Sequence, residues 1–152
     1  MSNTNKKGFT IIEVVLVLAI AGLIFLMVFI ALPALQRSQR DTQRRQDVSK
    51  VLSQLQQYQT NNRGKIPANH TEANGTFLSQ YLKGGTTSTE FVEPKSGTPY
   101  VFTNANPNNH QMQYVVNQKC NGESLGGAGG GNRAVAVRVK LEGAGYYCQD
   151  NQ

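Results

Sequence analysis

Glu13 lies between two apolar pairs, Ile11–Ile12 and Val14–Val15, near the start of the chain. An ionised carboxylate in hydrocarbon costs at least a few kcal/mol, so an acid in such a position is expected to have a function and a partner. The alternative is that Glu13 lies at a membrane interface, where the positive N-terminal end of a helix stabilises its charge. These residues alone leave both interpretations open.

Other residues that could do chemistry lack the spacing that such chemistry needs. His70 and His110 are isolated in Asn-rich stretches, and no Cys/His cluster has zinc-ligand spacing. The segment from Gly129 fits G-x-G-x-x-A, but it precedes an expected strand instead of a helix, which argues against a dinucleotide site. Asn69 and Asn74 each begin a glycosylation sequon, a short pattern that also arises by chance. We therefore expect no enzyme, no metal and no cofactor.

The apolar residues that must position Glu13 are concentrated at the N-terminus. Hydrophobic residues make up 39% of the 152-residue chain, and 23 of them fall between residues 9 and 35. Val14 to Leu32 carries no charge, and as a helix it would cover about 28 Å, close to the hydrocarbon thickness of a bilayer. A secretory signal cleaved after Ala21 would leave a long apolar new terminus, so we favour a membrane helix that is retained.

The stretch Lys6-Lys7-Gly8-Phe9-Thr10-Ile11-Ile12-Glu13, followed by this apolar run, resembles the type IV prepilin signature. That signature is a short basic leader ending in Gly, then Phe, then Glu as the fifth residue of the mature chain. The resemblance covers the leader and the helix, residues 1 to about 55. It implies that prepilin peptidase cuts between Gly8 and Phe9 and methylates the amine of Phe9. It also implies that Glu13 pairs with a Phe9 amine, its own or a neighbour's, in a filament.

Such a pair is chemically reasonable because cleavage would turn Phe9 into a terminal amine that is largely cationic at neutral pH. Pairing offsets the cost of burying both charges, although desolvation can match the Coulomb gain. Its role is then to set register, since a subunit docked one turn out of place would leave a charge in apolar surroundings.

Gly22 and Pro33 are the helix-weakening residues of this segment, by about 1 and 3 kcal/mol relative to Ala. In related pilins this part of the helix can lose order when subunits pack into a filament, and the resemblance implies Gly22 and Pro33 as sites of that loss. The equally weighted alternative is that they are ordinary membrane-helix Gly and Pro residues.

The same helix is predicted to continue to about Thr60, because one apolar stripe recurs at helical spacing: Val48, Val51, Leu52, Leu55 and Tyr58. Gly64 is suited to a left-handed cap. Residues 65–75 are expected to form a loop, and Phe77 to Leu82 a short amphipathic helix. Strands are predicted at residues 100–102, 112–118, 134–141 and 146–148. The clearest is 134–141, where every second residue is a large apolar one: Val135, Val137, Val139 and Leu141. The predicted fold is α+β, with a long N-terminal helix packed on a small antiparallel sheet. The expected divisions are a leader (1–8), a transmembrane and polymerisation helix (9–35), the amphipathic half of that helix (36–62) and a globular head (63–152).

Cys120 and Cys148 suggest one disulfide in an oxidising compartment, with two free buried thiols as the alternative. The bridge would enclose the glycine-rich segment 122–131, which we expect to be flexible, and would stabilise the head by about 2–4 kcal/mol. Type IV pilins often carry such a cysteine-bracketed C-terminal region.

The formal net charge of +6 is scattered, but Arg37, Arg40 and Arg44 share one helical face. They could bind the phosphates of DNA or lipid; we favour a solvated collar with Asp41 and Asp47 as local partners, which leaves nucleic-acid binding unsupported. The excess of positive residues after the span, taken alone, places the head in the cytoplasm. We favour export, which the cysteine pair and the prepilin-like leader imply.

The resemblance as a whole implies a type IV pilin subunit. Such a chain is a single-pass protein of the cytoplasmic membrane with a cytoplasmic N-terminus, in contact with membrane lipid until assembly. An inner-membrane assembly platform then polymerises it with copies of itself into an extracellular pilus for adhesion, twitching motility or DNA uptake. One alternative is a minor pilin or a type II secretion pseudopilin. An alternative from another class is a monomeric membrane-anchored binding module.

Overall fold

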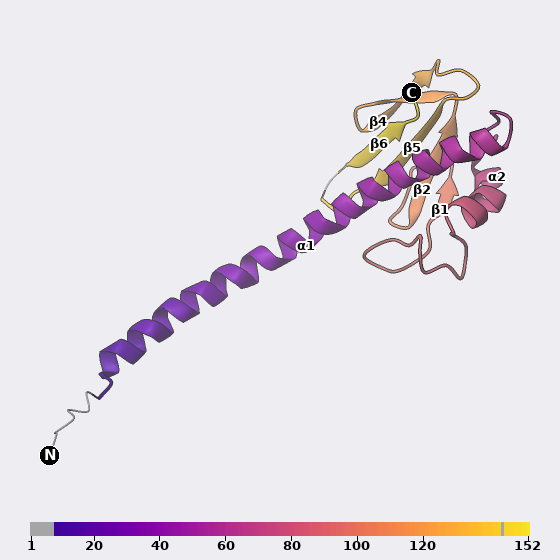
Figure 1. The fold of residues 1–152 in the computed structure, drawn as a ribbon. Coiled ribbons are helices and arrows are strands. Elements are labelled where there is room, and N and C mark those ends of the chain that lie inside the picture. The colour runs from indigo at the N-terminus through magenta and orange to yellow at the C-terminus, as the bar shows by residue number, and fades with distance from the viewer. Residues whose placement is uncertain (1–7, 144) are drawn as a thin grey trace. The chain divides into compact units, whose positions relative to one another are not determined.

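A computed structural model describes residues 8–143 and 145–152 of the chain (Figure 1). Of the expected leader, only Gly8 lies within the described residues, and Lys6 and Lys7 lie outside them. Contacts divide the chain into an N-terminal unit, Met1–Gln36, and a C-terminal unit, Arg37–Gln152. The two units are described separately below.

Helix α1 spans Ile11–Asn61, within two residues of the predicted bounds at each end, and it contains Pro33. The helix ends where Asn62 N donates to Tyr58 O (2.9 Å) and Gly64 N donates to Gln59 O (2.7 Å). Gly64 has a φ of 78°, so it occupies the left-handed conformation predicted for the cap.

The main sheet has four strands in the order β1-β2-β5-β6. Strands β2, β5 and β6 pair antiparallel, whereas β1 pairs parallel with β2. The α+β fold class is therefore confirmed, with a sheet that is mainly antiparallel. The bounds are β1 Val101–Thr103, β2 Gln111–Val116, β5 Val135–Lys140 and β6 Tyr146–Asp150.

Three predictions about local structure are wrong. Residues 65–75 are not all loop, because α2 (His70–Glu72) is followed by the helical segment η1 (Ala73–Tyr81), which is kinked at Gly75. The side chain of Asn69 accepts from Glu72 N (2.9 Å) and so caps α2. Burial of side chains such as Phe77 against the core then stabilises η1.

The glycine-rich segment 122–131 also differs from the expected flexible loop. Residues Ser124–Ala128 form strand β4, which pairs antiparallel with β3 (Gln118–Asn121) as a separate hairpin. A Cβ at Gly126 would lie 3.0 Å from Lys119 O, so glycine permits the close approach of the two strands. The expected strand over residues 112–118 is divided because Asn117 has a φ of 62°.

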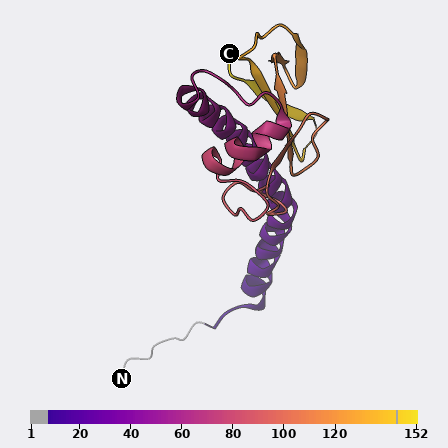
Figure 2. The same cartoon turned by 90° about the vertical axis from the view of Figure 1, so that its right-hand side faces the viewer.

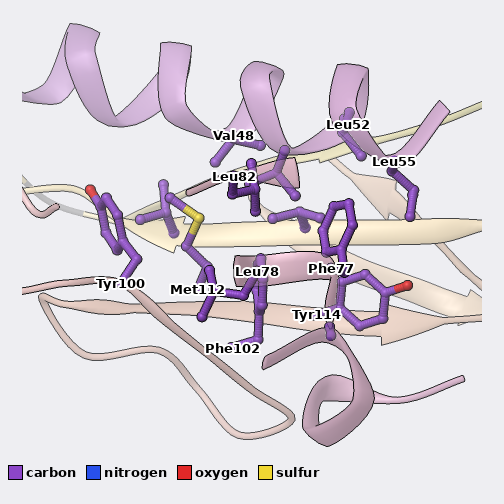
Figure 3. Packing of buried hydrophobic residues seen from close by; sticks show 14 of the residues in the cluster. Val48, Leu52, Leu55, Phe77, Leu78, Leu82, Tyr100, Phe102, Met112 and Tyr114 are labelled. Carbon is purple, nitrogen blue, oxygen red and sulfur yellow. The ribbon is translucent and has the colours of Figure 1, made fainter. Parts of the chain in front are cut away.

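The hydrophobic core of the C-terminal unit lies between one face of the main sheet and the helices α1 and η1 (Figures 2 and 3). Helix α1 contributes the predicted apolar stripe, and Val48, Val51 and Leu55 have no exposed surface. Tyr58 is partly buried at the margin of the core, where its ring meets Phe77 edge-on at 5.6 Å. The other large contributors are Phe77, Leu78, Leu82, Phe91, Tyr100, Phe102, Met112, Tyr114, Val135, Val137 and Val139.

Candidate functional site

The first turn of α1 is closed by hydrogen bonds between Thr10 and Glu13. Thr10 N donates to Glu13 Oε2 (2.9 Å), and Thr10 Oγ1 donates to the same oxygen (2.8 Å). The sequence T-x-x-E at a helix start is typical of a capping box, and the structure contains its Glu half, in which the Glu side chain accepts from a backbone N–H that has no partner in the helix. Glu13 therefore holds the helix start, a role that the sequence pattern could have revealed. Its pairing with a Phe9 amine stays a prediction.

Gly8 and Phe9 precede the helix and are exposed, Phe9 with 90% of its surface accessible. The bond between them lies outside regular structure, where a protease can bind the chain in an extended form. This position is compatible with the predicted cleavage, which stays a prediction together with methylation of Phe9.

The first half of α1 exposes its apolar side chains in every direction. Within the described residues, every large exposed hydrophobic side chain lies between Phe9 and Leu35, and the C-terminal unit has none. The helix is long and apolar enough to cross a membrane, and its most apolar stretch is not buried against the rest of the protein. This surface requires lipid or other apolar helices around it.

Gly22 and Pro33 both lie within α1, which runs through them. A Cβ at Gly22 would meet nothing within 4 Å, so packing inside the chain does not require glycine there. Pro33 lacks the N–H that would bond to the carbonyl of Phe29. Their predicted role as sites where the helix loses order remains a prediction.

In the C-terminal unit, an ion-pair cluster forms around Arg44 of α1. Its side chain is only 1% exposed, and Nη1 donates to Asp41 Oδ1 (2.8 Å). Nη2 donates to Glu93 Oε1 and to Glu142 Oε1, the latter at 3.0 Å. Arg44 is thus surrounded by carboxylates from three segments of the chain.

Arg40, one turn earlier, binds Glu142 with two nitrogens: Nε donates to Oε1 (2.6 Å) and Nη2 to Oε2 (2.8 Å). Asp41 accepts from Glu142 N (2.8 Å), so the helix also holds the backbone just after β5. The predicted solvated collar is therefore wrong for Arg40 and Arg44, although Asp41 is the local partner of Arg44 as expected. Only Arg37 of the three is exposed without a carboxylate partner among the described residues.

The cluster shifts the pKa values of Glu142, Glu93 and Arg44. Hydrogen bonds from Arg40 lower the pKa of the Glu142 carboxyl to about 2, and the charge of Arg44 adds to this effect. Burial alone would raise the pKa of Glu93, but hydrogen bonds from Arg44 and Ser96 outweigh it, so the pKa is lowered. Burial likewise opposes the charge of Arg44, yet Glu93 and Asp41 raise its pKa on balance. All these groups are ionised at neutral pH.

The prediction that Asp47 pairs with the arginines is wrong. Burial raises the pKa of its carboxyl to about 6. Asp47 Oδ2 and the hydroxyl of Tyr100 are both buried, and the charges of Lys50 and Arg44 and the neighbouring Tyr100 hydroxyl offset only part of the effect of burial on Asp47. Burial raises the pKa of Tyr100 as well, and the nearby Asp47 carboxylate contributes to that shift.

Cys120 of β3 and Cys148 of β6 form the expected disulfide. Cys120 N also donates to Asp150 Oδ2 (2.7 Å), which adds a second link between the hairpin and β6. The bridge therefore fastens the β3–β4 hairpin to the main sheet.

The remaining candidates do not gather into a site. Within residues 8–143 and 145–152, no three His, Cys, Asp or Glu side chains lie close enough to hold a metal ion. The side chains of both sequon asparagines are engaged: Asn69 caps α2, and Asn74 binds the backbone of Phe102 through its oxygen (2.6 Å) and nitrogen (2.8 Å). Sequence reasoning missed Glu93 and Glu142 as arginine partners, because only the folded arrangement brings them to α1.

Comparison with known proteins identifies the N-terminal segment. Residues 3–29 match the family model described as the prokaryotic N-terminal methylation motif. No curated protein and no solved structure matches the chain. The matched residues include Gly8, Phe9, the Thr10–Glu13 capping box and most of the apolar run. The chain therefore carries the prepilin-type methylation signature at the start of an apolar helix that fits a membrane-anchored, single-pass protein.

Proposed function

We propose that this chain is a type IV pilin-like structural subunit that polymerises through the first half of α1. One observation carries the proposal: the prepilin-type motif at residues 3–29 covers most of the segment, Phe9 to Leu35, that holds all large exposed apolar side chains of the described residues. Lipid covers this surface before assembly, and sister helices cover it in the filament. The chain thus exchanges one apolar environment for another, at little net cost in hydrophobic free energy.

Processing begins with prepilin peptidase, which cuts between Gly8 and Phe9 and methylates the Phe9 amine. Gly8 has no side chain to obstruct the protease, and both residues are exposed ahead of the helix. The cut leaves Thr10 and Glu13 in place, so the capping box of α1 persists in the mature chain.

Glu13 has two roles in this proposal. It caps its own helix through Thr10, and in the filament its charge pairs with a Phe9 amine. A carboxylate accepts several hydrogen bonds at once, so the two roles are compatible. The ion pair favours the correct register because any other register leaves a charge in apolar surroundings.

The C-terminal unit forms the exposed part of the filament. Its disulfide fits an oxidising compartment, which supports export from the cytoplasm. Copies of the chain and an inner-membrane assembly platform are the proposed partners, and the final location is an extracellular pilus. Adhesion, motility and DNA uptake are the activities that such a filament serves.

Minor pilins and type II secretion pseudopilins use the same N-terminal chemistry, so either is an alternative within the same class. A monomeric membrane-anchored module is the alternative from another class. Binding of DNA by the arginine face is disfavoured, because Arg40 and Arg44 are already bound to carboxylates within the C-terminal unit.

Mass spectrometry of filaments sheared from cells tests the proposal. The expected result is this chain as a filament component that begins at N-methylated Phe9. A Gly8→Lys variant, which should block the peptidase, provides the control and should be absent from the sheared fraction. Recovery of the wild-type chain only from membranes, with residues 1–8 retained, would overturn the proposal in favour of a monomeric anchor.

A further inference from the structure

A groove on the C-terminal unit is lined by three positively charged side chains, Arg63, Lys65 and Arg133. Its volume is about 690 Å³, within the range of small-ligand sites. Half-buried Ile66 and Val116 provide apolar surface in the same groove. The full lining is Arg63, Gly64, Lys65, Ile66, Ala68, Glu72, Val116, Asn132 and Arg133.

These three cations have no partner among the described residues, in contrast to many others of the C-terminal unit. Arg40, Arg44 and Lys83 pair with carboxylates. Arg45, Lys50 and Arg138 lie over the rings of Tyr147, Phe91 and Tyr146. Glu72 is the one acid in the groove lining, and its Oε2 accepts from Ala68 N (2.8 Å). The lining therefore carries a formal excess of positive charge.

Arg133 is held in position by contacts from two sides. Its guanidinium packs against Gly64, where an added Cβ would lie 3.2 Å from Arg133 Nη2. Its carbonyl accepts from Asn151 Nδ2 (2.9 Å), and Asn151 Oδ1 accepts from Val135 N (2.8 Å). The guanidinium thus lies on the glycine that separates Arg63 from Lys65 in the chain. Three cations from two distant segments of the chain therefore line the same groove.

We propose that this groove binds a compact, multiply charged oxyanion, a phosphate monoester whose organic part lies against Ile66 and Val116. Guanidinium groups bind phosphate through two parallel hydrogen bonds, and a lysine adds a point charge. A terminal phosphate carries more charge on one group than a phosphodiester does, which suits a single groove lined by three cations. An extended nucleic-acid strand would instead need charges spaced along its backbone. The proposal does not rest on filament assembly.

Isothermal titration calorimetry on the full chain in uncharged detergent micelles tests this site, with phenyl phosphate, inorganic phosphate and an unphosphorylated dT10 oligonucleotide as probes. Phenyl phosphate is expected to bind more tightly than inorganic phosphate, and the oligonucleotide more weakly than either. Arg133→Gln should weaken phenyl phosphate binding about tenfold or more. Lys65→Gln is a second variant that leaves the core untouched. Lys119→Gln, at an exposed lysine outside the groove lining, is the matched control and should bind as wild type.

Three results would overturn the proposal. Tighter binding of dT10 than of phenyl phosphate would show a surface for extended polyanions instead of a monoester site. Arg63 and Lys65 also follow the negative C-terminal end of α1, where cations stabilise a helix. The two groove variants could lower the melting temperature and leave phenyl phosphate binding unchanged, which would show that the cations serve only the helix end. Absence of phenyl phosphate binding by the wild-type chain would also contradict the proposal.

Discussion

The guanidinium of Arg44 and the carboxylate of Glu93 form an ion pair across 49 residues of sequence, and each side chain is only 1% exposed. Glu93 is held from the other side by Ser96, whose N (2.6 Å) and Oγ (2.8 Å) both donate to Oε2. The pair thus joins α1 to the turn between Val92 and Pro99, which themselves form a β-bridge. Removing one partner would leave the other charge buried and uncompensated.

Arg44→Leu is therefore expected to destabilise the folded chain by about 3–5 kcal/mol, because it strands the carboxylate of Glu93. Urea unfolding followed by circular dichroism measures the change. Arg37→Leu, at an exposed position of the same helix, is the matched control and should change stability by no more than about 0.5 kcal/mol. Equal effects of the two substitutions would contradict the role of the buried pair.

Glu142 is expected to make the fold sensitive to acid. Its pKa is about 2 in the folded chain and 4.5 for the unperturbed group, so the unfolded state binds more protons between these values. The stability that Glu142 contributes is complete above about pH 4.5 and is lost as pH falls toward 2. Glu142→Gln should flatten the dependence of the urea midpoint on pH in this window. An unchanged slope would show that Arg40 and Arg44 do not act through this carboxylate.

Asp47 is expected to act in the opposite direction. Its pKa is raised from 3.8 to about 6, so the folded state binds more protons between these values. Stability should therefore fall as pH rises from about 4 to 6, and Asp47→Asn should remove this fall. Urea midpoints of the variant and wild type at pH 4 and pH 7 measure the difference. A variant that gains no stability over wild type at pH 7 would contradict the burial of an ionised Asp47.

Periodicity alone predicted the elements whose residues pack against a single surface. The stripe Val48, Val51 and Leu55 indicated the buried face of α1, and the alternation of Val135, Val137 and Val139 indicated β5. The residue type alone also predicted the left-handed cap at Gly64. These predictions succeeded because each depends on residues close together in the sequence.

The features that the sequence did not predict depend on distant contacts. Asp41 was found as a partner of Arg44 because it lies three residues away, whereas Glu93 and Glu142 lie 49 and 98 residues away. Strand β4 escaped prediction because its glycines lack strand propensity, and only the close approach to β3 explains them. Thr10 and Glu13 lie only three residues apart, so the hydrogen bonds between them were predictable from the sequence.

Asn74 is expected to protect the edge of the main sheet at β1. Its carboxamide accepts from Phe102 N and donates to Phe102 O, which occupies both backbone groups of this edge residue. Asn74→Asp replaces the donor with a carboxylate oxygen facing a carbonyl, and should cost about 1–3 kcal/mol in urea unfolding. Because an unpaired edge favours association, the variant should also aggregate more readily in light-scattering measurements. Asn109→Asp, at an exposed loop asparagine, is the matched control and should match wild type in both measurements.

Two substitutions distinguish the two roles of Glu13, the helix cap and the assembly charge. Glu13→Gln keeps an oxygen that can accept from Thr10 N and Oγ1 but removes the charge, whereas Thr10→Ala removes the hydroxyl donor and keeps the charge. If the ion pair with Phe9 sets the register, Glu13→Gln should reduce the subunit in sheared filaments at least about tenfold, by analogy with the loss of a charged hydrogen bond. Thr10→Ala should reduce it less, since it removes only one of the two hydrogen bonds to Glu13, worth about 1 kcal/mol, and keeps the bond from the backbone N.

Both variants should accumulate in the membrane and be cleaved as wild type is, which immunoblots of membrane fractions check. Filaments that form normally with Glu13→Gln but fail with Thr10→Ala would show that the cap, and not the charge, is what assembly requires.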